Sequence, residues 1–94
     1  MPYIFVRHKV RDYAAWKPAF DRHGVTRKAG GGKGSRVFRS ADNPNEVLIL
    51  MEWDTIANAK KFAQSADLKT VMQAAGVVEE PTIFFLDQAD QQPQ

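Results

Sequence analysis

Two short segments of the chain, residues 47–51 and 83–86, are apolar at every position. Their short length and their β-branched and aromatic residues indicate β-strands. An antiparallel strand with one face in water alternates apolar and polar residues, whereas these two segments do not. Both faces of the sheet that contains them must therefore be covered, and the rest of the chain has to show what covers each face.

Alternation and helical spacing predict a first strand over residues 3–10 and a first helix soon after it. One face of the strand is apolar except for a histidine, and it consists of Ile4, Val6, His8 and Val10. Asp12 is a suitable N-cap for the helix. Pro18 removes a backbone donor, so we expect regular helix to begin near Ala15. The apolar stripe of this helix consists of Tyr13, Trp16, Phe20 and either His23 or Gly24.

The middle of the chain contains a glycine-rich segment, residues 28–34, which we expect to be a mobile break. A strand over residues 35–41 follows it. Turn-forming residues at 42–45 then predict a hairpin that returns as an antiparallel strand over residues 46–53.

The last part of the chain is predicted to contain two helices and a closing strand. Asp54 or Thr55 caps the first helix, and Ser65 interrupts it and caps the second, which ends at Gly76. The inward positions of the second helix are Leu68, Val71, Met72 and Ala75. Residues 77–87 form the closing strand, in which a proline marks an edge, an end or a bulge.

This order of elements is typical of the α+β, ferredoxin-like βαββαβ fold, a four-stranded antiparallel sheet with helices on one face. The short helices suffice for that face alone, and a second copy related by twofold symmetry is the simplest cover for the other. We therefore expect a homodimer through the sheet face. Residues 1–87 are expected to form one domain, and the polar residues 88–94 a disordered C-terminal tail.

The composition excludes several classes of protein. The 94 residues include no cysteine, which excludes disulfides and thiolate metal sites and agrees with a reducing compartment. Neither a signal peptide nor an apolar run of membrane-spanning length is found, so a cytoplasmic protein without membrane contact is expected. Residues 1–39 hold ten of the thirteen Lys and Arg, but without clustered aromatics, so nucleic acid is not an expected partner.

With these elements the chain resembles the dimeric α+β barrel superfamily, in particular its small antibiotic-biosynthesis-monooxygenase-like and cyclase-like proteins. The resemblance rests on VRHKVRDYAAW at 6–16 with Phe20-Asp21, VLILMEWD at 47–54 with Ala59 and Phe62, and PTIFFL at 81–86. It covers residues 3–87 and implies a pocket in each subunit between sheet and helices. It also implies oxygenase chemistry on an aromatic polyphenol without metal or flavin, with Trp53 supplying an indole.

His8 is the candidate catalytic residue, because it is the one polar residue on the inward face of the first strand. A partly buried imidazole titrates near neutral pH and can act as a general base or hydrogen-bond a phenol. A purely structural interpretation stays open, in which His8 is a core histidine bonded to a backbone carbonyl or to Tyr13.

The candidate substrate-binding residues are Tyr13, Trp16, Phe20, His23 and Trp53. Their aromatic bodies suit a planar ligand. Core packing is the alternative, favoured for Trp16 and Phe20 and equally balanced for Trp53. His23 is expected to be half-exposed. The two histidines have no fixed spacing to carboxylates, so no metal site is predicted.

Two charged features have structural interpretations. Glu52 is expected on the sheet face assigned to the dimer, in an ion pair at the dimer interface with a base of the N-terminal half: Arg7, Lys9 or Arg39. The glycine-rich loop at 29–34 matches neither the phosphate-binding nor the dinucleotide-binding pattern. It is either a lid over the pocket or a linker, or it attracts an anion through its flanking bases Arg27, Lys28, Lys33 and Arg36.

The leading hypothesis is a small-molecule enzyme similar to cofactor-independent monooxygenases or cyclases. Its ligand would be flat and partly apolar, aromatic or polyketide-like, with His8 as base or hydrogen-bonding group. No cofactor is expected. The alternative is a non-catalytic ligand-binding or regulatory dimeric module of the same fold. The residues do not name a substrate.

Overall fold

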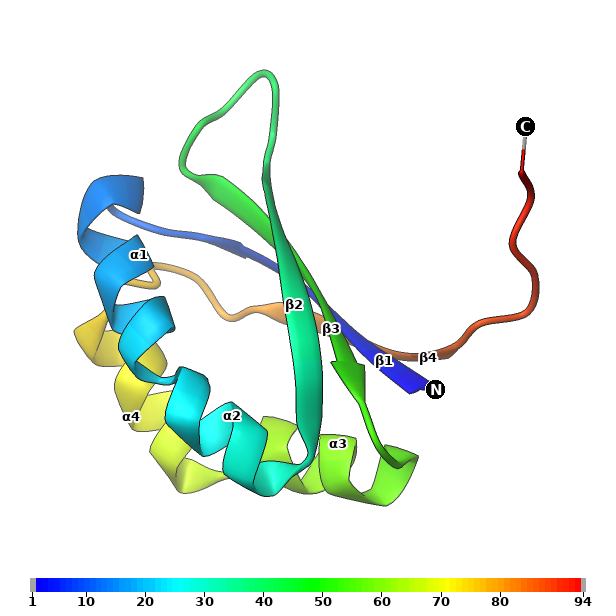
Figure 1. Ribbon diagram of the computed structural model, residues 1–94. Coiled ribbons are helices and arrows are strands. Elements are labelled where there is room, and N and C mark those ends of the chain that lie inside the picture. The colour runs from blue at the N-terminus through cyan, green and yellow to red at the C-terminus, as the bar shows by residue number, and fades with distance from the viewer. Residues whose placement is uncertain (1, 94) are drawn as a thin grey trace.

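The computed structural model describes residues 2–93, so the outer ends of the predicted domain and tail, residues 1 and 94, lie outside it. The elements within this range are β1 (Pro2–Lys9), α1 (Tyr13–Arg22), α2 (Gly24–Gly30), β2 (Gly32–Arg39), β3 (Glu46–Trp53), α3 (Ile56–Ala63), α4 (Ala66–Ala74) and β4 (Thr82–Asp87). The strands form an antiparallel sheet in the order β2-β3-β1-β4, and the helices gather on one side of it (Figure 1). The predicted ferredoxin-like α+β fold is confirmed.

The pairing of β1 with β3 decides which residues face the helices. Ile4 lies opposite Met51, Val6 opposite Ile49 and His8 opposite Val47. These side chains are buried between sheet and helices, together with Val10, Trp16, Trp53, Ala59 and Phe62. The alternation in the first strand therefore marks the core face as predicted.

The other face of the sheet, called here the open face, is uncovered by any element among residues 2–93 (Figure 1). Its apolar members are Phe5, Phe38, Leu48, Leu50, Phe84 and Leu86. Phe38 and Phe84 are each about half exposed, at 51% and 50%. Aromatic side chains clustered on one surface indicate a region that another molecule covers.

Helix α1 begins at Tyr13, so the expectation of a start near Ala15 was wrong. Two side chains cap the helix: Asp12 Oδ1 accepts from the Ala14 N–H at 3.2 Å, and Asn45 Oδ1 accepts from the Tyr13 N–H at 3.1 Å. Pro18 lies inside the helix. The fixed φ of proline is compatible with a helix, but its missing N–H removes one backbone hydrogen bond. The two caps offset the stability lost with that bond.

The glycine-rich segment is not a mobile break, which corrects the sequence-based expectation. Its first residues belong to α2, Gly31 has a left-handed φ of 116° as the C-cap, and Gly32 already begins β2. A Cβ at Gly32 would lie 2.9 Å from the Arg27 carbonyl oxygen. The glycines therefore allow a tight helix-to-strand junction, and the segment is neither lid nor free linker.

The second half of the chain follows the prediction closely. Thr55 and Ser65 cap α3 and α4, and Gly76, with a φ of 90°, follows the end of α4. The closing strand is shorter than predicted, because only Thr82–Asp87 pair and Val77 makes a single bridge to Val10. Proline at position 81 cannot donate to a ladder, which explains the late start.

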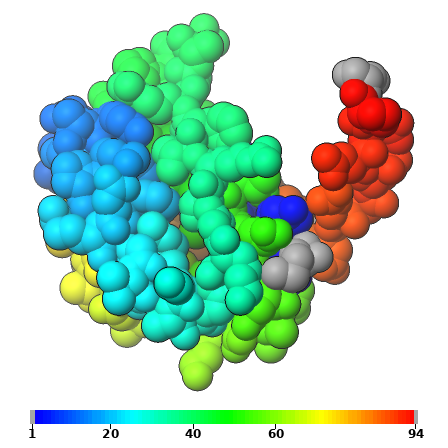
Figure 2. All heavy atoms as spheres, viewed as in Figure 1, coloured from blue at the N-terminus to red at the C-terminus, as the bar shows by residue number. Residues whose placement is uncertain are grey.

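Residues 88–93 contain neither helix nor strand and project from the body of the molecule (Figure 2). One contact holds their beginning, in which the Tyr3 hydroxyl donates to Gln88 Oε1 at 3.2 Å. Within the described chain no helix is long and apolar enough to cross a membrane.

Candidate functional site

His8 is buried on the inward face of β1, with 5% of its surface exposed. Neither Nδ1 nor Nε2 has a hydrogen-bond partner among the described residues. The hydrogen bond expected from a backbone carbonyl or Tyr13 in the structural interpretation is therefore not formed in the described chain, although the ring is buried as that interpretation expects. Burial lowers the pKa of His8 to about 4, so the ring is neutral at pH 7. A neutral imidazole in this setting offers one free acceptor and one free donor.

A cavity of about 50 Å³ adjoins this ring and is called here the His8 cavity. Its walls come from β1, β3, β4 and the helices, and their exposed surface is almost entirely apolar. Predicted site residues that line it are His8, Trp16, Phe20 and His23. Residues of α4 and its C-cap close another side: Leu68, Val71, Met72 and Ala75. The structure thus brings four of the six predicted site residues to one cavity.

The aromatic residues of α1 form a row beside His8. The ring centroids of Tyr13 and Trp16 lie 5.7 Å apart, and those of Trp16 and Phe20 lie 4.9 Å apart in a stacked arrangement. Tyr13 is at the outer end, where the Arg39 guanidinium lies 4.1 Å from its ring centroid, and it does not line the cavity. Trp16 and Phe20 are therefore both core residues and cavity walls.

His23 is buried, so the expectation of a half-exposed residue was wrong. It stands between α1 and α2, where the change of helix direction turns its side chain inward against Phe62. Its Nε2 lies 3.0 Å from Asp67 Oδ2 in the first turn of α4. This pair connects α4 to the α1–α2 junction beside the His8 cavity.

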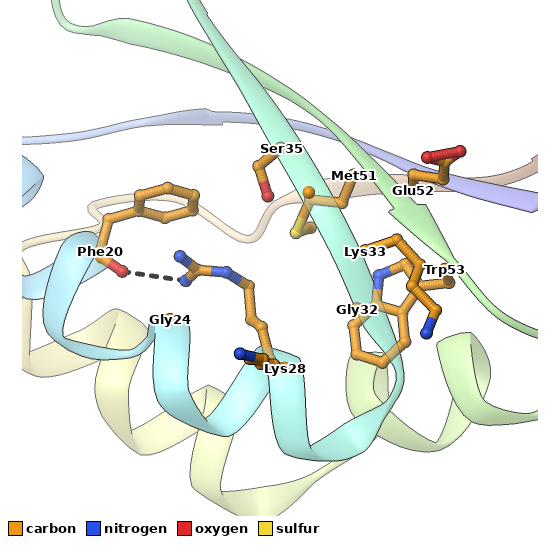
Figure 3. A pocket seen from close by; sticks show the side chains of 11 residues that line it. Phe20, Gly24, Lys28, Gly32, Lys33, Ser35, Met51, Glu52 and Trp53 are labelled. Atoms are coloured by element: carbon orange, nitrogen blue, oxygen red, sulfur yellow. Dashed lines mark hydrogen bonds between the residues drawn. The ribbon is translucent and has the colours of Figure 1, made fainter.

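Trp53 is fully buried and lies apart from His8. Its ring packs on Phe62, with centroids 4.9 Å apart, and its Nε1 has no hydrogen-bond partner in the described chain. It lines a second hollow, an open groove of about 630 Å³ between α2 and β2 (Figure 3). The cations of this groove, called here the basic groove, are Arg27, Lys28 and Lys33.

Arg27 was expected only as one of the bases beside the glycine-rich loop that could attract an anion, and not as part of the pocket beside His8. It lines both the basic groove and the His8 cavity. The signal was available, since Phe20, His23 and Arg27 continue one helical stripe at spacings of three and four. A charged residue on an apolar stripe is easily assigned to solvent, and the bend at His23 further obscures the pattern.

Glu52 forms no ion pair within residues 2–93, and the ion pair predicted across the dimer interface stays a prediction. Arg7 Nε binds Glu46 at 2.9 Å, and Lys9 lies 3.8 Å from Glu79. Arg39 Nε donates to the Pro44 carbonyl. Across residues 2–93, no group of three His, Asp or Glu side chains is arranged to hold a metal ion.

No protein-family model and no curated protein sequence matches this chain. Solved structures do match over nearly its whole length. A candidate antibiotic biosynthesis monooxygenase from Bordetella bronchiseptica has a TM-score of 0.76 at 19% identity, covering 94% of this chain and 96% of its own. SnoaB, a cofactor-independent oxygenase from Streptomyces nogalater, has a TM-score of 0.77 at 13% identity, covering 99% and 97%.

Rv0793 from Mycobacterium tuberculosis has a TM-score of 0.70 at 14% identity and covers 96% of both chains. At these identities the likeness shows a shared fold. The resemblance to antibiotic-biosynthesis-monooxygenase-like proteins is therefore confirmed at the level of the fold.

Proposed function

We propose that this protein is a small-molecule enzyme of the cofactor-independent oxygenase or cyclase kind. Its ligand is a flat, partly apolar molecule, aromatic or polyketide-like, held between the sheet and the helices. The observation that carries the proposal is the His8 imidazole, which is buried beside an apolar cavity with both nitrogens free. Buried polar groups are almost always hydrogen-bonded, so a free pair indicates a partner that the protein does not supply.

His8 would act as the base. Because the ring is neutral at pH 7, its free nitrogen can accept a hydrogen bond from a phenol, and proton transfer along this bond would leave the imidazolium paired with the phenolate. The resulting phenolate is richer in electrons than the phenol and is more readily oxidised by dioxygen. The row of Trp16 and Phe20 would lie along the flat body of the ligand. The shared fold with SnoaB, itself a cofactor-independent oxygenase, supports this assignment.

The cavity has to enlarge before such a ligand enters. A volume of about 50 Å³ is far below the roughly 300–1,000 Å³ of a ligand pocket. Helix α4 is the wall best placed to move, because none of its residues is fully buried. We therefore propose that ligand entry displaces α4 from the cavity.

The open face supports a second part of the proposal, a homodimer through the sheet. Half-exposed aromatic side chains such as Phe38 and Phe84 lie on a face that no element among residues 2–93 covers. A second copy would cover it by the same residues on both chains. The other proposed partner is the small-molecule ligand.

Oxygen consumption tests the catalytic part of the proposal. The wild-type protein and the His8→Leu variant are each given naphthalene and anthracene hydroquinones, and Lys61→Gln on the exposed side of α3 serves as control. The expected result is turnover that falls about 100-fold or more in His8→Leu and is unchanged in Lys61→Gln. Equal turnover in His8→Leu would remove His8 from the chemistry. Binding without turnover would favour the non-catalytic ligand-binding module.

A further inference from the structure

Arg27 stands between the basic groove and the His8 cavity. Phe20, Arg27 and Met51 line both hollows. The guanidinium carbon of Arg27 lies 3.8 Å from the centroid of the Phe20 ring, and its Nη1 donates to the Phe20 carbonyl at 2.9 Å, the bond drawn as a dashed line in Figure 3. Arg27 and Phe20 therefore form part of the wall that the basic groove and the His8 cavity share.

The Arg27 guanidinium is incompletely paired. It has five N–H donors, of which the Phe20 carbonyl takes one. Within residues 2–93 no carboxylate lies at ion-pair distance from it. Burial lowers the pKa of Arg27, and the charge of Asp21 offsets this only in part. An arginine remains charged in such a setting, so a free, half-buried guanidinium favours an anion from outside the chain.

The rest of the basic groove adds positive charge and a flat wall. In Figure 3, α2 with Lys28 forms one side and β2 with Lys33 and Ser35 forms the other. Glu52 is the carboxylate on the lining, so cations outnumber acids there three to one. Trp53 lies behind this lining, where its indole N–H is buried and has no hydrogen-bond partner in the described chain. The groove volume of about 630 Å³ suits a small molecule.

We propose that the ligand of this protein is an aromatic carboxylic acid. Its carboxylate binds the Arg27 guanidinium in a bidentate manner, with Lys33 as a second cation, and its ring extends past Phe20 toward His8. The planar fork of arginine matches a carboxylate, and the apolar cavity beyond it accepts only the uncharged part of the molecule. This inference rests on the proposed function, because it names the substrate class of the same site.

A matched pair of probes tests the proposal by titration calorimetry. The acid is 3-hydroxy-2-naphthoate, and its methyl ester is the control that lacks the charge. The expected result is that the wild-type protein binds the acid about tenfold or more tightly than the ester. Arg27→Gln and Lys33→Gln should each weaken acid binding more than ester binding and so remove most of this preference. Arg22→Gln removes one positive charge from the exposed end of α1 and should leave the preference intact.

The other outcomes separate the inference from the proposed function. Equal binding of acid and ester by the wild-type protein would overturn the carboxylate assignment and leave the His8 pocket standing. Binding of the acid that depends on Arg27 but is unchanged in His8→Leu would support the anion site and contradict the extension of the ring to His8. Lys33 is exposed and structurally undemanding, so its variant tests the groove even where Arg27→Gln fails to fold. Absence of binding by both probes overturns both proposals.

Discussion

The edge of the His8 imidazole meets the indole of Trp16, with ring centroids 5.6 Å apart and planes inclined at 64°. Packing of this kind fixes the position of the imidazole without any hydrogen bond to it. Protonation would therefore place an unpaired charge in an apolar cavity, and such a charge is strongly disfavoured. The packing on Trp16 that leaves the His8 nitrogens free for a ligand therefore also makes the stability of the fold depend on pH.

The first prediction is that the free energy of unfolding falls as the pH drops from 6.5 toward 4. The folded-state pKa of His8 is about 4, against 6.5 for the ordinary group. Between these values the unfolded chain binds a proton that the folded chain does not, so acid favours unfolding, by about 3 kcal/mol in total. Above pH 6.5 both states are neutral and His8 contributes no pH dependence. Urea unfolding at several pH values measures the effect.

His8→Leu is the control, since it removes the titrating group and should flatten this part of the profile. The two carboxylates with lowered pKa values, Glu46 and Asp54, do not interfere above pH 5. The pKa of Glu46 is lowered by its hydrogen bond from Arg7, and that of Asp54 by its hydrogen bond from Asn58. The stability they contribute is lost only below their ordinary pKa values of 4.5 and 3.8. A His8 ring that titrates near 6.5 by NMR would contradict the prediction.

A second prediction concerns Trp53, whose ring is fully buried against Phe62. Trp53→Ala should lower the free energy of unfolding by about 3–5 kcal/mol, because it leaves a large cavity. Trp53→Phe should cost much less, about 1–2 kcal/mol, because the indole N–H makes no hydrogen bond that would be lost. Chemical denaturation distinguishes the two variants. Equal losses would show that the N–H is bonded in solution.

Strand alternation accounts for what could be predicted from the sequence. Alternation with a period of two in the first strand places His8 on the buried face. The uninterrupted apolar run at 47–51 requires that both faces of the sheet be covered. Both patterns are set by neighbouring residues in the sequence, so they can be recognised without knowledge of distant contacts.

The remaining features depend on contacts between distant residues. His23 is buried because the chain bends after α1 and because Asp67, forty-four positions later, meets it. The glycines resemble a flexible loop by composition, but their conformation is decided by the approach of β2 to α2. Neither of these relationships has a signature in a single sequence window.

A third prediction tests the attachment of α4. The Asp67 carboxylate lies at hydrogen-bond distance from the His23 ring. It also places a negative charge in the first turn of α4, where the helix dipole favours one. Asp67→Ala should lower the free energy of unfolding by about 1 kcal/mol. It should also increase amide hydrogen exchange in Ala66–Ala74 more than elsewhere. Lys69→Ala, exposed on the same helix, is the control, and equal exchange in both variants would show that the pair does not hold α4.

A fourth prediction concerns Gly31, the left-handed residue between α2 and β2. A Cβ there would collide with the carboxylate of Asp54, and the φ of 116° is strained for any other residue. Gly31→Ala should therefore lower the free energy of unfolding by about 1–3 kcal/mol, as measured by thermal or urea unfolding. Gly30→Ala is the matched control inside α2, where a Cβ would lie 3.4 Å from the Trp53 ring. Comparable stability of the two variants would argue against the tight junction.

The fifth prediction is that the protein is a dimer through the open face. One charged substitution on this face tests it. Phe84 packs on Phe5 at a centroid distance of 6.3 Å and is half exposed in one chain, so Phe84→Glu should leave the monomer folded. In a dimer built through the sheet, the same substitution places two carboxylates in an apolar interface, where burying each charge is strongly unfavourable. Light scattering at micromolar concentration should show a dimer for the wild-type protein and a monomer for Phe84→Glu. Val25→Glu is the matched control, because Val25 is 79% exposed on α2, on the helical side of the molecule, and this variant should stay dimeric. A wild-type monomer under these conditions would leave the open face without its proposed partner.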